Sequence, residues 1–215
     1  MTTKSLNQLP SEIAGKLLDI GAVALRPEEP FTWTSGLKSP IYCDNRLTMS
    51  YPDIRELVAE GFAAVIREQY PDAEVIAGTA TAGIPHAAWV AQKLNLPMIY
   101  VRDKAKGHGK QNLIEGQVTE GQKVVVIEDL ISTGGSSIKA AQAVREAGAK
   151  VLAVVAIFTY QFASAEGAFA EAGVPLQTLS NYSALIDVAA ERGIVANSQL
   201  ASLQAWREDP TSYGK

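Results

Sequence analysis

The chain has 215 residues and a formal net charge of −4 at pH 7. This length is enough to bury one substantial core, and we expect a single domain over residues 1–215. The acidic balance leaves no broad basic surface for a nucleic-acid backbone, which argues against nucleic-acid binding.

Cysteine usage and apolar runs indicate the compartment. The single cysteine, Cys43, cannot form an intramolecular disulfide, and residues 1–10 lack the apolar stretch of a secretory signal. The longest apolar run, residues 151–158, is too short to cross a membrane and suits a buried strand. We therefore expect a cytoplasmic protein that has no membrane segment.

The first part of the chain, about residues 1–46, is expected to form a segment that we call the hood. The sequence predicts a helix from an N-cap at Ser11 to about Ile20, and short strands joined by turns over residues 31–44. An amphipathic helix over residues 51–70 follows, and its apolar face predicts packing against a core.

From residue 75 onward, short apolar runs alternate with helical segments. Strands are predicted at 75–77, 98–101, 123–127 and 151–158, and helices at 84–94 and 136–147. This order predicts an α/β fold in which helices flank a mainly parallel central sheet. We assign about residues 50–160 to the ligand-binding core and about 161–215 to helical elements.

The strand predicted at 123–127 leads into a stretch that suits a sugar phosphate. Its residues are Glu128, Asp129, Leu130, Ile131, Ser132, Thr133, Gly134, Gly135 and Ser136. The two glycines permit backbone amides to approach phosphate oxygens at the positive end of the next helix. The two acids, at the carboxyl end of a strand, can accept hydrogen bonds from ribose hydroxyls. Taken alone, a Thr-Gly-Gly-Ser sequence is more typical of an ordinary capped βα turn, and the paired acids behind the apolar strand favour the phosphate site.

A second segment gathers basic residues in an acidic protein: Arg102, Lys104, Lys106, His108 and Lys110, interrupted by Gly107 and Gly109. Without a ligand, such a run is typical of a solvated loop. If the ligand carries pyrophosphate, the arginine can bind phosphate oxygens bidentately and the lysine can supply a point charge. The histidine is suited to hydrogen bonding or proton transfer near neutral pH. His86, the other histidine, is expected to have a packing or capping role.

Residues 124–136 resemble the 5-phosphoribosyl 1-pyrophosphate (PRPP) signature of the type I phosphoribosyltransferases. Residues 31–46 and 102–109 are similar to the hood and the catalytic loop of the orotate phosphoribosyltransferases, and with residues 78–85 the likeness extends over about residues 10–160. The resemblance implies the type I phosphoribosyltransferase fold and transfer of the phosphoribosyl group of PRPP to N1 of orotate. The products would be orotidine 5'-phosphate and pyrophosphate, as in pyrimidine biosynthesis.

The resemblance also implies catalytic residues, a cofactor and a partner. Arg102 and Lys106 would stabilise charge on the leaving pyrophosphate, and His108 would have a proton role. Mg²⁺ would be carried with PRPP, and we name no protein ligand for it, because Mg²⁺ bound to phosphate oxygens keeps several waters. The chain would form a homodimer in which loop residues complete the neighbouring site.

For the base, the resemblance implies contacts from Ser132, Lys38, Tyr42 and Cys43, with Lys38 near the orotate carboxylate and Tyr42 as an apolar wall. A simple hairpin remains the alternative for the hood motif. A phosphoribosyltransferase for another base and a PRPP-binding regulator without catalysis remain alternatives for the function.

The chain departs from the pattern of other members at several positions. Thr34 stands where some members have a lysine of the hood, and Asp103 stands where some have a second basic residue. Thr81 and Ala82 stand at an expected Tyr-Lys pair, and Tyr160 lies near the place of an arginine that other members direct at orotate. The sequence therefore leaves open which cation compensates the charge of orotate. Lys38, Lys104 and Lys110 are the candidates.

Overall fold

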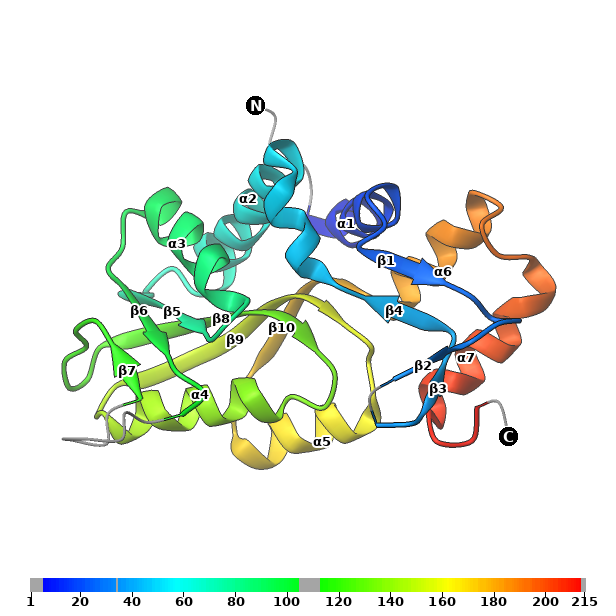
Figure 1. Cartoon of the computed structure of the whole chain (residues 1–215). Coiled ribbons are helices and arrows are strands. Elements are labelled where there is room, and N and C mark those ends of the chain that lie inside the picture. The colour runs from blue at the N-terminus through cyan, green and yellow to red at the C-terminus, as the bar shows by residue number, and fades with distance from the viewer. Residues whose placement is uncertain (1–5, 34, 105–112, 214–215) are drawn as a thin grey trace.

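The computed structural model describes residues 6–33, 35–104 and 113–213, in which helices cover both faces of a six-stranded sheet (Figure 1). The strand order is β10-β9-β8-β5-β6-β7, and β7 alone in this sheet runs antiparallel to its neighbour. The strands are β5 (Val75–Thr79), β6 (Met98–Val101), β7 (Ile114–Glu115), β8 (Lys123–Ile131), β9 (Lys150–Thr159) and β10 (Leu176–Asn181). The predicted α/β fold with a mainly parallel sheet is confirmed.

Alternation along the strands separates two cores. Val125 and Ile127 of β8 pack with the helices on one face, whereas Val124 and Val126 pack with the helices on the other. The first face is covered by α1 (Leu9–Asp19), α2 (Pro52–Gln69), α3 (Gly83–Leu94) and α6 (Tyr182–Glu191), and the second by α4 (Gly135–Glu146) and α5 (Ala163–Ala172). Burial of both faces explains why the strand sequences are continuous runs of valine and isoleucine.

The hood consists of α1 and two small antiparallel sheets. β1 (Val23–Leu25) pairs with β4 (Ile41–Cys43), and β2 (Phe31–Thr32) pairs with β3 (Lys38–Ser39). The predicted short strands are confirmed, although β1 was not predicted. The predicted N-cap at Ser11 is wrong, because Gln8 is the N-cap and Ser11 lies inside the first turn. Pro10 accounts for the earlier start, since proline is favoured where its missing N–H has no helical partner.

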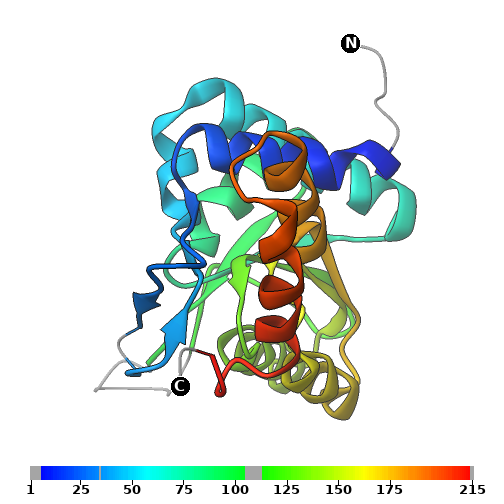
Figure 2. The same ribbon diagram turned by 90° about the vertical axis from the view of Figure 1, so that its right-hand side faces the viewer.

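The last part of the chain contributes a strand as well as helices. β10 pairs with β9 in the central sheet, so the assignment of residues 161–215 to helical elements was incomplete. A 3-10 turn (Asn197–Gln199) leads into α7 (Leu200–Glu208), which runs beside the hood strands (Figure 2). Within the described ranges, no helix is long and apolar enough to cross a membrane.

Candidate functional site

Two pockets adjoin at the carboxyl ends of β5 and β8, where Cys43 and Leu130 line both of them. The acid pocket, of about 650 Å³, is lined by Cys43, Asp44, Arg46, Met49, Ala80, Thr81, Ala82, Pro85, Glu128, Asp129, Leu130 and Ser136. The aromatic pocket, of about 460 Å³, is lined by Phe31, Thr32, Trp33, Ser35, Tyr42, Cys43, Leu130, Ser132 and Tyr160. The site therefore lies where ligands bind in open α/β sheets, between the core and the hood.

Glu128 and Asp129 place two buried carboxyl groups at the acid pocket. Glu128 is 5% exposed, and its Oε2 accepts hydrogen bonds from the hydroxyls of Ser137 at 2.9 Å and Ser136 at 3.3 Å. The backbone N–H of Asp129 donates to Oε1 of Glu128 at 3.0 Å. Burial raises the pKa of both carboxyl groups, and the charge of Asp129 raises that of Glu128 further. The pair is therefore costly to ionise until a ligand supplies donors or positive charge.

We expect the substitution Glu128→Gln to stabilise the ligand-free protein increasingly as pH rises. The folded-state pKa of Glu128 lies above the ordinary value of 4.5, so the protonated form is favoured in the fold. The protonated Glu128 carboxyl therefore costs no stability below its unfolded pKa. As pH rises from there through the folded pKa, ionisation of Glu128 lowers the free energy of unfolding by about 1.4 kcal/mol per unit of difference between the two pKa values. Urea unfolding of both proteins from pH 4 upward tests this, and a difference that does not change with pH would contradict it.

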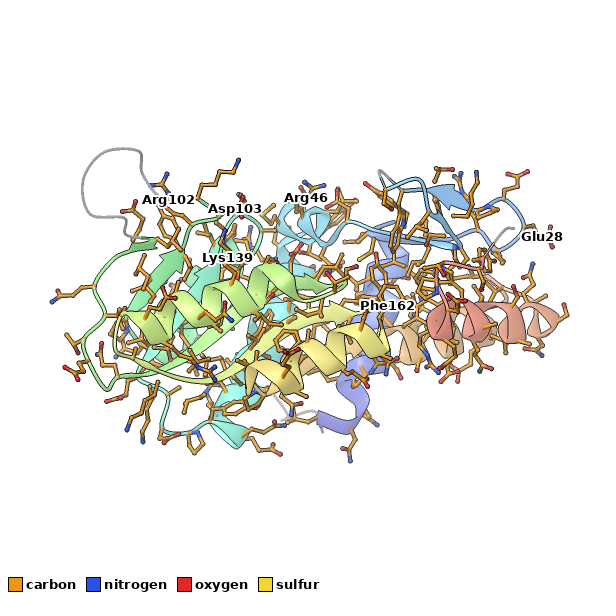
Figure 3. The ribbon with its side chains drawn as sticks, turned by 90° about the horizontal axis from the view of Figure 1, so that it is seen from below. Glu28, Arg46, Arg102, Asp103, Lys139 and Phe162 are labelled. Atoms are coloured by element: carbon orange, nitrogen blue, oxygen red, sulfur yellow. The ribbon has the colours of Figure 1, made fainter. Side chains whose placement is uncertain are left out.

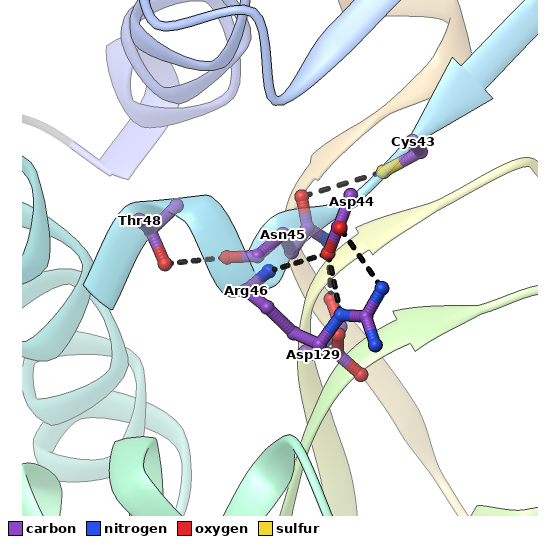
Figure 4. Close-up of polar contacts among 6 residues, drawn as sticks. All are labelled: Cys43, Asp44, Asn45, Arg46, Thr48 and Asp129. Carbon is purple, nitrogen blue, oxygen red and sulfur yellow. Dashed lines mark hydrogen bonds and ion pairs between the residues drawn. The ribbon is translucent and has the colours of Figure 1, made fainter. Parts of the chain in front are cut away.

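Asn45 connects the hood to the acid pair. It lies in the 3-10 helix η2 (Asn45–Ser50), is 1% exposed, and donates from Nδ2 to the backbone oxygen of Asp129 at 2.7 Å. Its own carbonyl accepts the hydroxyl of Thr48 at 2.6 Å, and the Cys43 thiol donates to its Oδ1 at 3.4 Å (Figure 4). This role was missed, because the contact joins residues 84 positions apart and no local pattern indicates it.

Arg46 is the one cation that lines the acid pocket among the described residues. Its guanidinium donates bidentately to Asp44, from Nε at 2.6 Å and from Nη2 at 2.9 Å, and it lies beside Asp129 in Figure 4. These bonds lower the pKa of Asp44. Asp44 thus holds the Arg46 guanidinium at the rim of the acid pocket and partly neutralises its positive charge. The exposed side of the guanidinium stays available to an anion.

Residues 128–136 comprise the end of β8, a short loop and the start of α4, and they line the pockets through part of their length. Leu130 and Ser132 line the aromatic pocket, and Ser136, with Glu128 and Asp129, lines the acid pocket. Thr133, Gly134 and Gly135 line neither, and the side chain of Ile131 is fully buried in the core.

Gly134 cannot be replaced without disturbing this loop. It has a φ of +81°, and an added Cβ would lie 2.5 Å from the ring of Phe169. A glycine is therefore required both by the left-handed backbone and by the close approach of α5.

Four aromatic side chains line the aromatic pocket: Phe31, Trp33, Tyr42 and Tyr160. Tyr42 is 47% exposed and its ring lies 5.8 Å from that of Phe31, while the rings of Trp33 and Tyr160 lie 5.6 Å apart. Of the residues predicted to contact the base, Tyr42, Cys43 and Ser132 line this pocket. The sequence did not predict Phe31, Trp33 or Tyr160 as lining residues.

Cys43 lines the aromatic pocket as predicted, whereas Lys38 does not. Lys38 does not line the pocket, but its Nζ donates to the hydroxyl of Thr32, which does, at 2.8 Å. Burial and the nearby charge of Asp129 raise the pKa of the Cys43 thiol, so it stays neutral at the border of the two pockets. The described side chains that line the aromatic pocket are thus uncharged, and Lys38 lies behind one of them, Thr32.

Arg102 lies outside both pockets. It follows β6, and its Nη1 is 3.4 Å from Oε1 of Glu115 in an ion pair. Next to it, the backbone oxygen of Asp103 accepts a hydrogen bond from Nζ of Lys139 at 2.5 Å, and the three side chains lie at one edge of the molecule (Figure 3). Thr34, Lys106, His108 and Lys110 lie outside the described residues.

His86 has the packing role that the sequence predicted. It is 1% exposed and lies between the rings of Phe62, at 6.3 Å, and Trp89, at 5.3 Å. Burial lowers its pKa to about 4. It is therefore neutral at physiological pH and lines neither pocket.

Comparison with known proteins adds independent findings. Residues 50–177 match the phosphoribosyl transferase domain family. The orotate phosphoribosyltransferase of Enterococcus faecalis is 59% identical over 210 residues, which is 98% of this chain and 100% of the relative. That of Halalkalibacterium halodurans is 60% identical over 200 residues, 93% of this chain and 95% of the relative.

Solved structures agree in fold. The orotate phosphoribosyltransferase of Aeropyrum pernix superposes with a TM-score of 0.73 at 28% identity, covering 86% of this chain and 99% of that one. UMP synthase of Leishmania donovani gives a TM-score of 0.77 at 30% identity, with 92% of this chain covering 42% of that longer chain.

Proposed function

The chain belongs to the orotate phosphoribosyltransferases, within the phosphoribosyl transferase family, and from this premise we propose how its two pockets divide the substrates. Its activity is orotate phosphoribosyltransferase activity, a pentosyl transfer in pyrimidine biosynthesis. PRPP would occupy the acid pocket and orotate the aromatic pocket. The carbon that exchanges pyrophosphate for the base would then lie at their common border, beside Leu130 and Cys43.

The observation that supports this division is the adjacency of two pockets of opposite chemistry. The acid pocket offers carboxylate acceptors for ribose hydroxyls and Arg46 for an anion, whereas the aromatic pocket offers rings to stack on a planar base. A ligand that carries both a ribose phosphate and a base would span the border. Neither pocket alone has that chemistry.

We propose that catalysis depends mainly on stabilising the negative charge that develops on the leaving pyrophosphate. Breaking the bond between ribose C1 and pyrophosphate builds positive character on the sugar and negative charge on pyrophosphate. Glu128 and Asp129 would hold the ribose, while Arg102 and Lys106 would stabilise the departing anion. His108 would accept or return a proton during the transfer, and closure of the loop would exclude water that hydrolyses PRPP.

The donors at the acid pocket suit a Mg²⁺ ion that enters with PRPP. Among the described residues no group of three or more histidines, cysteines and acids could hold a metal, and the pocket instead presents the adjacent pair Glu128 and Asp129. Mg²⁺ takes few protein carboxylates when phosphate oxygens and waters complete its shell, so this set fits. When bound, the ion neutralises charge on the pyrophosphate oxygens.

For the carboxylate of orotate, we propose Lys38. Its hydrogen bond to Thr32 holds the ammonium group next to the pocket wall, and the side chain is exposed and free of acidic partners among the described residues. A small reorientation would direct it to a bound anion, because lysine is a flexible point charge.

We further propose a cytoplasmic homodimer in which Arg102 and the segment after it complete the site of the neighbouring chain. The position of Arg102, outside both pockets and paired with Glu115, supports this arrangement. The proposed compartment rests on cysteine usage, because the single cysteine, Cys43, cannot form an intramolecular disulfide.

The experiment that tests the function is the loss of orotate absorbance when the protein is mixed with PRPP and Mg²⁺. Uracil, hypoxanthine and nicotinate are assayed in parallel, each as an alternative base in place of orotate. We expect orotate alone to be consumed, with stoichiometric release of pyrophosphate. Turnover of another base would contradict the assignment of the aromatic pocket, and PRPP binding without any turnover would favour a regulatory protein.

A further inference from the structure

A cluster of aromatic side chains connects the aromatic pocket to the C-terminal helix. Trp206 of α7 is 1% exposed, and its ring lies 5.9 Å from Trp33 and 5.8 Å from Tyr160, both in edge-on contact. Trp33 and Tyr160 line the pocket and contact one another at 5.6 Å. Trp206 thus closes a triangle of rings behind the pocket wall without lining the pocket.

The residue after Tyr160 is fixed from the same direction. The backbone of Gln161 has a φ of +60°, which residues other than glycine rarely adopt. Its Oε1 accepts hydrogen bonds from the backbone N–H of Ser183 at 2.9 Å and from the Ser183 hydroxyl at 2.7 Å. That hydroxyl in turn accepts from Nη1 of Arg207 at 2.8 Å. Two consecutive residues of α7 therefore support Tyr160 and Gln161. Trp206 packs against Tyr160, and Arg207 is connected to Gln161 by hydrogen bonds through Ser183.

Contacts at both ends keep α7 against the hood. Before its first turn, Nε2 of Gln199 donates to Oε1 of Glu28 at 2.9 Å, and after its last turn the hydroxyl of Tyr213 donates to the backbone oxygen of Pro27 at 3.0 Å. On the other side of the pocket wall, the backbone N–H of Tyr160 donates to the oxygen of Ile131 at 3.2 Å. The pocket wall is thus held between the end of β8 and the C-terminal helix α7.

We propose that Trp206 is a positioning residue for the base, acting through Tyr160 and Trp33, with the Gln161–Ser183–Arg207 chain as a second support. The proposal rests on the assignment of orotate to the aromatic pocket. Trp33 and Tyr160 must keep their positions in the pocket wall for a planar base to stack on it, and a small displacement of such groups weakens binding. The proposed PRPP site lacks this support, because Trp33 and Tyr160, through which Trp206 acts, do not line the acid pocket.

Steady-state kinetics of Trp206→Leu and Trp206→Phe test the proposal. Loss of the edge-on contacts with Trp33 and Tyr160 is expected to raise KM for orotate about tenfold in the leucine variant, with KM for PRPP and kcat little changed. The phenylalanine variant keeps an aromatic edge and should recover most of the affinity. Orotate binding measured by calorimetry should weaken in parallel.

The matched control is Phe62→Leu, which removes another fully buried ring of the same core cluster that lines neither pocket. It should lower Tm without changing KM for orotate. Equal effects of the two leucine variants on KM for orotate, or an unchanged KM in Trp206→Leu, would overturn the proposal.

Gln161→Ala keeps the test decisive if Trp206→Leu fails to fold. Removing the acceptor should raise KM for orotate about threefold, in line with the loss of a typical hydrogen bond. An unchanged KM for orotate in this variant would overturn the second support. A wild-type protein that does not consume orotate would instead overturn the proposed function, and these outcomes are distinguishable because the wild type is assayed first.

Discussion

Replacement of Lys106 by alanine is expected to lower kcat by about two orders of magnitude, with little change in the free energy of unfolding. The lysine is proposed to stabilise negative charge that develops on pyrophosphate only as the C1–O bond breaks. Removal of such a contact lowers kcat and kcat/KM together, because the contact is made in the transition state. Stopped-flow or steady-state turnover of orotate, beside urea unfolding, measures both effects.

Lys104→Ala is the matched control, since it removes the same charge from the same basic segment. Lys104 is exposed and precedes the part of the segment that lies outside the described residues. We expect it to change kcat less than tenfold, within the range of a surface charge near a site. Similar losses in both variants would show that the segment acts through net charge, and an unchanged kcat in Lys106→Ala would remove Lys106 from the mechanism.

Asp129→Asn is expected to lower kcat/KM for PRPP by about 10–100-fold, because hydrogen bonds to a charged acceptor contribute about 1.5–3 kcal/mol. Asp129 lines the acid pocket beside Glu128, and its backbone is fixed within β8 and by Asn45, so we expect the substitution to leave the strand in place. KM for orotate should change little, since Asp129 does not line the aromatic pocket.

The control for charge is Asp187→Asn, an exposed acid on α6 that lines neither pocket. It should leave all kinetic constants unchanged. If Asp129→Asn raised KM for orotate and left PRPP unaffected, the assignment of the two pockets would be reversed.

The two variants together test the shared site. If loop residues of one chain complete the site of its neighbour, mixtures of Lys106→Ala and Asp129→Asn chains should contain hybrid dimers with one intact site. Random exchange of equal amounts predicts recovery of about one quarter of wild-type activity. Mixtures that remain as inactive as the separate variants, or a fully active monomer, would contradict the shared site.

The sheet and the acid pair could be predicted because their signals are local. An apolar run with two acids and a glycine turn behind it defines β8, the acid pair and the start of α4 without reference to the rest of the chain. β10 was missed for the converse reason. Its sequence, Leu-Gln-Thr-Leu-Ser-Asn, is short and polar, and it becomes a strand because β9 offers an edge to pair with.

The residues that the sequence did not reveal act through long-range contacts. Asn45 holds the backbone of Asp129 from the hood, and Trp206 supports Tyr160 from the last helix. An asparagine after a strand and a tryptophan in an amphipathic helix are typical of turns and cores, so neither residue type indicates a site. Only the packing of both chain ends against the core brings them to the pockets.

The residue that compensates the negative charge of orotate could not be predicted from the sequence either. The sequence indicates that Thr34, Ala82 and Tyr160 occupy places where basic residues are found in other members, but it cannot say what stands near the base instead. The structure places rings and hydroxyls at the described part of the pocket wall, with Lys38 behind Thr32. Recognition would then depend on stacking, on the Ser132 hydroxyl and on one lysine at the rim.

The most direct test of the two-pocket account is a crystal structure of the protein with orotidine 5'-phosphate, because this product contains the base and the ribose phosphate in one molecule. We predict the base in the aromatic pocket between Tyr42 and Tyr160, the ribose hydroxyls at Glu128 and Asp129, and the glycosidic bond beside Leu130. A base bound away from the aromatic pocket, or a ribose that does not approach the two acids, would contradict the account.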